Sequence, residues 1–128
     1  MAHSINPLGE FGQFLMVHLR DRGIDHFDRL LAAHWKAPAL AKIQSELQTL
    51  TPEQRALARR AFVTSLDSAI HDFLFQLQDQ ADSHDGHIAV TVAGQNIATM
   101  SDGLHGEPFT DEGWRARYSA YGEPPEEA

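Results

Sequence analysis

Hydrophobic residues in the first 50 positions recur at intervals of three and four, the spacing that places side chains on one face of a helix. The first predicted helix covers residues 8–22, and Gly23 follows it where a C-terminal cap would lie. Asp25 is a suitable N-cap for a second helix that ends near residue 36. A third predicted helix starts near Pro38 and ends near residue 50.

The strongest local signal is the start of a helix at Thr51. Thr51 is a favourable N-cap, Pro52 suits the first helical position, and Gln54 can complete a capping box. Neither glycine nor proline follows before residue 82, so we expect one long helix over 52–82. Its wide apolar arc is typical of a helix with several neighbours and consists of Phe62, Leu66, Ala69, Ile70, Phe73, Leu74 and Leu77.

The periodicity of the chain changes to two after residue 86. Ile88, Val90 and Val92 alternate with smaller residues, and Gly94 supplies a turn before a second run over 96–100. This pattern predicts a β-hairpin, which must rest on the helices or pair with another strand because an isolated hairpin is marginally stable. A loop over 101–108 follows.

The C-terminal segment contains a short predicted helix and several aromatic residues that can anchor it to the body of the protein, namely Phe109, Trp114, Tyr118 and Tyr121. The elements together predict an α+β fold that is mainly α, an antiparallel bundle of about four helices with a C-terminal β-hairpin and a short terminal helix. We expect a single domain over 1–122 and an acidic, disordered tail over 123–128.

The composition of the 128-residue chain excludes several kinds of site. Hydrophobic residues make up 42%, enough for a packed core, and the absence of cysteine excludes disulfides and Cys-ligated metals. No apolar run reaches the roughly 18 residues of a membrane span, and the first residues lack a signal-peptide pattern. With a pI near 5.3, we expect neither nucleic acid nor a membrane as partner. These features predict a cytoplasmic protein.

The net charge of −8 is distributed unevenly along the chain. Residues 1–60 hold six acids and eight bases, whereas residues 61–114 hold nine acids and neither Lys nor Arg. The second region therefore predicts attraction to a basic protein.

One side of the predicted long helix is acidic around an aromatic residue. On a helical wheel this side spans about 140°, lies opposite the apolar arc and contains Asp67, His71, Asp72, Asp79 and Asp82. Phe75 lies in its middle, where a polar residue is normal. Either another segment covers Phe75, or Phe75 and its acidic rim bind a partner. The predicted partner-binding residues are Asp67, His71, Phe75, Asp79, Asp102, His105 and Glu107.

The 101–108 loop also contains side chains used in acyl transfer, namely Ser101, Asp102 and His105. Such groups normally converge from separate parts of a fold, and the loop lacks the GxSxG motif. We therefore predict no catalytic residue. The preferred interpretation is structural: Gly103 and Gly106 supply unusual backbone angles, while Ser101 and Asp102 bond to nearby amides. The alternative is a functional role in recognition.

A metal site is an alternative suggested by the eight histidines. His18, His34 and His71 lie on different predicted helices, so a bundle could bring them together with Asp67 as ligands for a divalent metal ion. An Asp–His surface pair explains Asp67 and His71 without a metal, and the chain has no HExxH motif.

The preferred functional hypothesis is a small acidic interaction protein without a cofactor, of the inhibitor or immunity type, that binds a basic protein. The alternative is a metal-binding helical bundle with hydrolase activity that uses the His/Asp set. A homodimer is a third hypothesis, because the basic region 1–60 and the acidic region 61–114 can attract each other between two copies.

Overall fold

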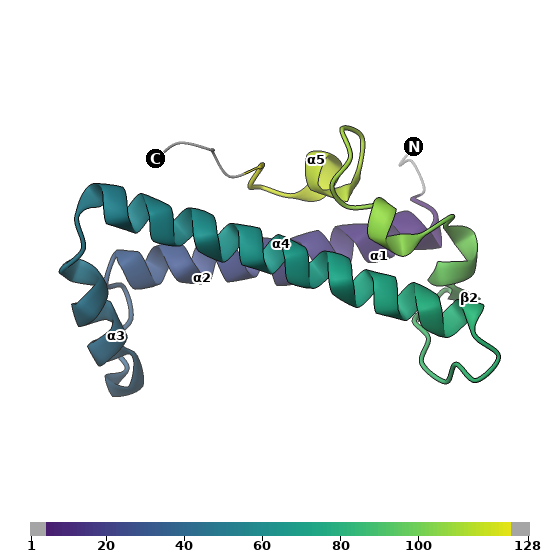
Figure 1. Cartoon of the computed structure of the whole chain (residues 1–128), viewed down its shortest axis with the longest axis horizontal. Coiled ribbons are helices and arrows are strands. Elements are labelled where there is room, and N and C mark those ends of the chain that lie inside the picture. Colours follow the sequence, from purple (N-terminus) through teal and green to yellow (C-terminus); the bar gives the residue numbers. More distant parts are fainter. Residues whose placement is uncertain (1–4, 124–128) are drawn as a thin grey trace.

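Two long helical segments lie side by side and antiparallel in the computed structural model, of which we describe residues 5–123 (Figure 1). The first segment consists of α1, a π-turn and α2, and the second is α4. The elements in chain order are α1 (Pro7–Leu15), the π-turn (Met16–Arg20), α2 (Asp21–Leu31), α3 (Pro38–Gln48), α4 (Pro52–Asp82), β1 (Thr91–Val92), β2 (Gln95–Asn96), two 3₁₀ turns (Ile97–Met100 and Leu104–Gly106) and α5 (Trp114–Tyr118). The predicted fold class, mainly helical with a hairpin and a short terminal helix, is confirmed.

Both long segments begin at side-chain caps. The Asn6 side chain accepts a hydrogen bond from the Gly9 amide at 2.8 Å and so starts α1. At the start of α4, Thr51 Oγ1 accepts from the Gln54 amide at 3.1 Å, and the Thr51 amide donates to Gln54 Oε1 at 2.8 Å. The predicted capping box is therefore confirmed.

The predicted break between the first two helices is wrong, because Gly23 lies inside α2. A Cβ atom at Gly23 would lie 3.3 Å from Leu66 and 3.6 Å from Phe62, so this glycine allows α4 to approach closely. Asp25 is not a cap either, since its carboxylate pairs with Arg29 at 2.9 Å one turn later. The first segment thus runs continuously from residue 7 to residue 31.

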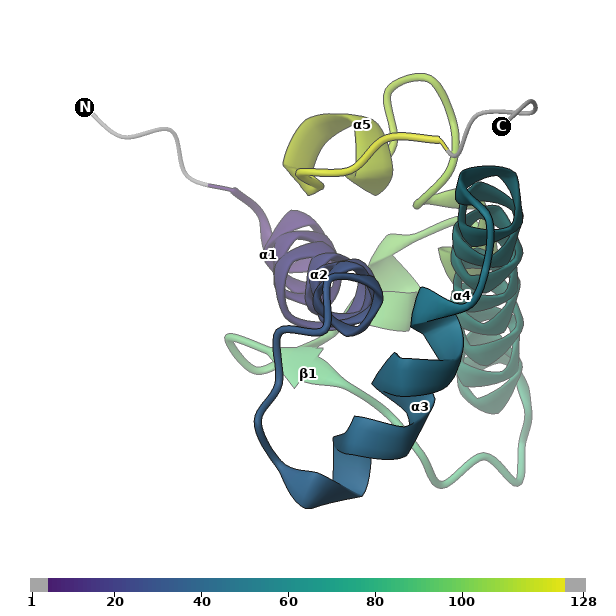
Figure 2. The ribbon, with the colours of Figure 1, turned by 90° about the vertical axis from the view of Figure 1, so that its left-hand side faces the viewer.

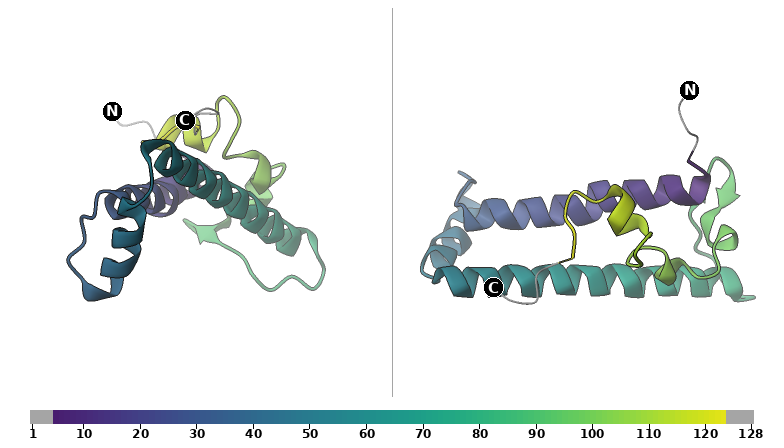
Figure 3. Two further views of the ribbon diagram at one scale, coloured as in Figure 1. Left: turned by 60° about the vertical axis from the view of Figure 1, so that its left-hand side comes forward. Right: turned by 90° about the horizontal axis from the view of Figure 1, so that it is seen from above.

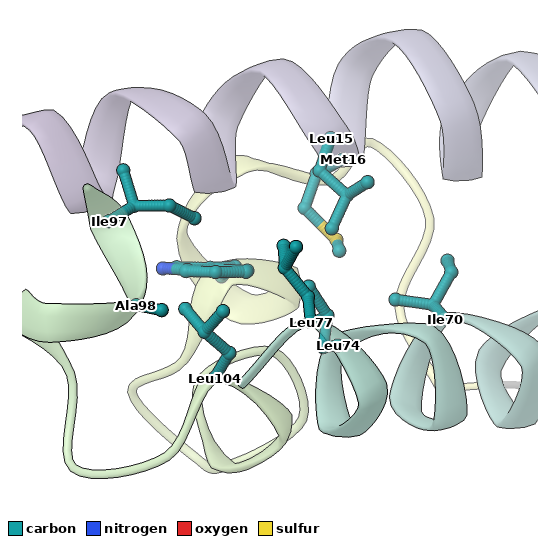
Figure 4. Close-up of a cluster of buried hydrophobic side chains, with 9 residues drawn as sticks. Leu15, Met16, Ile70, Leu74, Leu77, Ile97, Ala98 and Leu104 are labelled. Atoms are coloured by element: carbon teal, nitrogen blue, oxygen red, sulfur yellow. The ribbon is translucent and has the colours of Figure 1, made fainter. Parts of the chain in front are cut away.

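The main hydrophobic core lies between the two long segments and beneath the C-terminal segment (Figure 4). Trp114 of α5 is only 1% exposed and inserts from above. A Cβ atom at Gly12 would lie 2.4 Å from its indole ring, so α1 can receive Trp114 only because residue 12 lacks a side chain. The buried members of the cluster are Leu15, Met16, Ile70, Leu74, Leu77, Ile97, Ala98, Leu104 and Trp114.

The C-terminal segment crosses one side of the helix pair, as the view from above shows (Figure 3). The other side carries α3 near one end and β1 near the other (Figure 2). An ion pair between Arg59 and Asp28, at 2.7 Å, joins α4 to α2 near the α3 end. The hydrogen bond that Arg59 donates to Asp28 raises the pKa of Arg59 above its ordinary value.

The hairpin is shorter than the alternation predicts. Its antiparallel register pairs Thr91 with Asn96 and Val92 with Gln95, and Ala93 and Gly94 form the turn with positive φ values of 51° and 79°. The strand ends at Asn96 because its side chain accepts a hydrogen bond from the Ala98 amide at 3.0 Å and starts a 3₁₀ turn. No helix in the range 5–123 is both long enough and apolar enough to cross a bilayer.

Candidate interaction surface on the central helix

An aromatic cluster of Phe75, His71 and His105 lies on the outer surface of α4, and we call it the Phe75 cluster. His71 and Phe75 are one helical turn apart, and the second 3₁₀ turn places the His105 ring against both. The ring centroids of His105 and Phe75 are 5.1 Å apart, and those of His105 and His71 are 5.5 Å apart, both edge to face. Phe75 remains 48% exposed.

Gln78 of α4 fixes the loop that carries His105. The Leu104 amide donates to Gln78 Oε1 at 2.9 Å, and Gln78 Nε2 donates to the Ala98 carbonyl at 3.1 Å. Leu104 itself is fully buried beside α4. The buried Gln78 side chain thus bonds to the backbone at both Ala98 and Leu104. Because Leu104 precedes His105, these bonds hold the His105 ring against Phe75.

The acidic residues around the Phe75 cluster are exposed to different degrees. Asp72, Asp79 and Asp102 are exposed, and the Asp72 carboxylate lies 3.2 Å from His71 Nδ1. Glu107 is half-buried, and it accepts a hydrogen bond from Ser101 Oγ at 2.6 Å. Glu107 thus braces the loop. Asp72 and Asp79 lie within one helical turn of Phe75 on α4 and give the cluster a negatively charged rim, and Asp102 lies in the loop that carries His105.

Asp67 lies in an internal ion pair and not on this acidic rim. Its carboxylate is 14% exposed and accepts from the fully buried Arg20 at 2.6 Å and 3.1 Å. Arg115 Nη1 lies 3.6 Å from the same carboxylate. A buried guanidinium needs a carboxylate to offset its lost hydration, and this need turns Asp67 inward.

Arg20 also holds the C-terminal segment in place. Its guanidinium donates to Ser119 Oγ and to the Gly122 carbonyl, each at 2.9 Å, and to the Tyr121 carbonyl. Nothing in the local sequence around Arg20 indicated this role, because its partners lie 47 to 102 positions away.

The four residues of the predicted metal set lie in separate places. The His18 ring packs on Phe14 at a centroid distance of 4.8 Å, and His34 packs on Trp35 at 4.9 Å. His71 belongs to the Phe75 cluster, and Asp67 binds Arg20. Among residues 5–123, no group of three or more His, Asp or Glu side chains is arranged to hold a metal ion.

Ser101, one of the loop residues with side chains used in acyl transfer, forms a structural brace with Glu107. Ser101 Oγ donates to Glu107 and accepts from the Gly103 amide at 3.0 Å. The His105 ring turns to Phe75 and His71, so the loop does not present a serine activated by histidine.

What the arrangement offers is therefore a half-exposed aromatic ring in a negatively charged surround, set on a rigid helix. Comparison of the chain with protein-family models, with curated proteins and with solved structures gave no match.

Proposed function

We propose that the protein is a small acidic interaction protein of the inhibitor or immunity type, and that it binds a basic protein through the Phe75 cluster. The observation that supports this proposal best is the half-exposed Phe75 ring beside exposed aspartates. An aromatic anchor inside a ring of charge is a common form of binding hot spot.

The rigidity of the cluster also supports binding. Phe75 lies on a 31-residue helix, and the loop opposite it is attached through the buried Gln78. A partner would therefore meet a surface that is already ordered, and association would carry little entropic cost of ordering.

The charge of this region determines the sign of the charge expected on the partner. No Lys or Arg occurs between residues 61 and 114, and Asp72 and Asp79 lie within one helical turn of Phe75, so the surface beside Phe75 is negatively charged. Such a field attracts a basic surface and speeds its encounter at low ionic strength. A cytoplasmic location is part of this proposal, on the basis of a sequence without cysteine.

The metal-dependent hydrolase is not favoured as a second function. Its predicted ligands are separated among residues 5–123, and Asp67 already serves Arg20.

The test compares Phe75→Gln with a matched control, Leu57→Gln. Leu57 lies on the same helix and is 52% exposed, but it lies before the acidic region. The full-length tagged protein and both variants are used to capture proteins from the native cell, and each captured protein is then purified. We expect to capture a basic protein that binds the wild type and Leu57→Gln with similar affinity. Its affinity for Phe75→Gln should be lower by about tenfold or more.

The association rate supplies the second arm of the test. It should fall steeply when the salt concentration is raised from about 0.05 M to about 0.5 M. Equal capture by the wild type and Phe75→Gln, or a partner whose association rate ignores salt, would contradict the proposal.

A further inference from the structure

A second apolar surface lies on the side of the helix pair opposite α5, and we call it the lower groove. It is formed by Phe14, His18 and Leu19 of the first long segment, by Phe62 of α4 and by Val90 just before β1. Phe73 lies on the same strip of α4 as Phe62 and extends this surface. Two pockets mark its ends. One, of about 410 Å³, includes His18, Leu19, Phe62 and Trp35 near α3, and the other, of about 320 Å³, includes Phe14, Val90 and Val92 near the hairpin.

The two pockets are parts of one surface. Phe14 belongs to the hairpin-end pocket and His18 to the α3-end pocket, and their rings pack together at 4.8 Å. On α4, Phe73 follows Phe62 by 11 residues and Leu66 by seven, which places all three along one strip of the helix.

The exposure of these residues departs from the sequence prediction. Phe73 belongs to the apolar arc that the sequence predicts to be packed, but it is 56% exposed, and Phe14 is 65% exposed. Helices with an apolar strip normally bury it against another layer of secondary structure. In the part of the chain that the structure describes, α5 supplies such a layer only on the upper side.

Charge is divided between the two ends of the long axis. The α3 end, residues 21–60, holds seven bases and five acids. The hairpin end holds six acids and no base over 68–107, and Glu10 adds a further negative charge there. Two copies placed antiparallel therefore bring a positive end against a negative end twice, whereas two parallel copies bring like charges together.

We infer that a second copy of this chain packs antiparallel on the lower groove. A twofold axis perpendicular to the long helices relates the copies, so each Phe14–His18 pair lies near the centre of the contact and each hairpin end faces the partner's α3 end. The contact is isologous and adds to each helix pair the layer that it lacks. The Phe75 cluster lies on the other flank of α4, so the dimer leaves it open.

Analytical ultracentrifugation of the full chain tests this inference. We expect the wild type to sediment with twice the mass of 14.2 kDa at low salt. The double variant Phe14→Gln/Phe73→Gln removes two exposed apolar contacts and should raise the dissociation constant by about a hundredfold. Phe75→Gln is the control on the other flank and should leave the dimer unchanged. Both altered side chains of the double variant are exposed, and circular dichroism establishes that it folds.

Charge reversal distinguishes the antiparallel arrangement from a parallel one. Arg22 is exposed and lines the α3-end pocket. Arg22→Glu should raise the dissociation constant, because the facing hairpin end is acidic, and high salt should weaken the wild-type dimer. A monomer at every protein concentration, a dimer that survives Phe14→Gln/Phe73→Gln, or a dimer strengthened by Arg22→Glu would overturn the inference.

Discussion

The two sides of the helix pair differ in how completely the chain covers them. On the upper side, α5 inserts Trp114 into the core, and Arg20 binds the last described residues through three hydrogen bonds to 119–122. On the lower side, Phe14 and Phe73 are more than half exposed. On the lower side, α3 and β1 cover only the two ends, so the surface between them is available for another molecule.

Removal of Trp114 should show the largest difference in stability between substitutions on the upper side and substitutions on the lower side. Trp114→Ala leaves a cavity in the main core, and we expect a loss of about 3–5 kcal/mol in the free energy of unfolding. Phe14→Ala removes a ring of comparable kind from the lower side and should cost less than about 0.5 kcal/mol in the monomer. Urea denaturation of dilute protein measures both. Similar losses for the two variants would show that the lower side is packed as tightly as the upper.

Removal of the Asp67 carboxylate should have the next largest effect. Asp67→Ala leaves the fully buried Arg20 without its anion, and we expect a loss of about 2–4 kcal/mol. The matched control is Asp72→Ala on the same helix, whose exposed carboxylate should change stability by less than about 0.5 kcal/mol. Limited proteolysis adds a specific readout, because cleavage near residue 119 should accelerate only in Asp67→Ala. Equal proteolysis of the two variants would mean that Arg20 does not hold the C-terminal segment.

A smaller effect is expected at the glycine beneath Trp114. Gly12→Ala places a methyl group 2.4 Å from the indole, so the ring must move, at a cost of about 1–3 kcal/mol. At Gly106 an added Cβ meets no atom within 4 Å, so Gly106→Ala is the control and should be neutral or slightly stabilising. Thermal unfolding with tryptophan fluorescence reports both the stability and the environment of the ring. An unshifted emission spectrum in Gly12→Ala would contradict the close packing.

Local chemistry made the long helix and its cap predictable. Thr51, Pro52 and Gln54 act within one turn, so the sequence contains all that the capping box requires. The break predicted at Gly23 is wrong because a glycine that ends a helix and one that admits a neighbouring helix look alike in sequence. Only the approach of Leu66 and Phe62, some 40 residues away, distinguishes them.

Only those parts of the candidate site that depend on local spacing are predictable from the sequence. His71 and Phe75 share a helix face, so their proximity follows from spacing alone. Asp67 shares that spacing, but its orientation is decided by Arg20, 47 positions earlier. Gln78 carries no sequence signal for its role, because its partners, the Leu104 amide and the Ala98 carbonyl, are backbone groups that any residue would supply.

The π-turn at Met16–Arg20 has a consequence for the alignment of the first long segment. Residues four apart on a regular α-helix drift by about 40° around its axis at each step. The wider turn, closed by the Asp21 amide on the Met16 carbonyl, takes up this drift. Met16, Arg20 and Ile24, all fully buried, thus stay on one line. The π-turn therefore keeps the buried faces of α1 and α2 aligned. Deletion of a single residue within it would rotate the buried face of α2 away from α4, while α1 stayed in place.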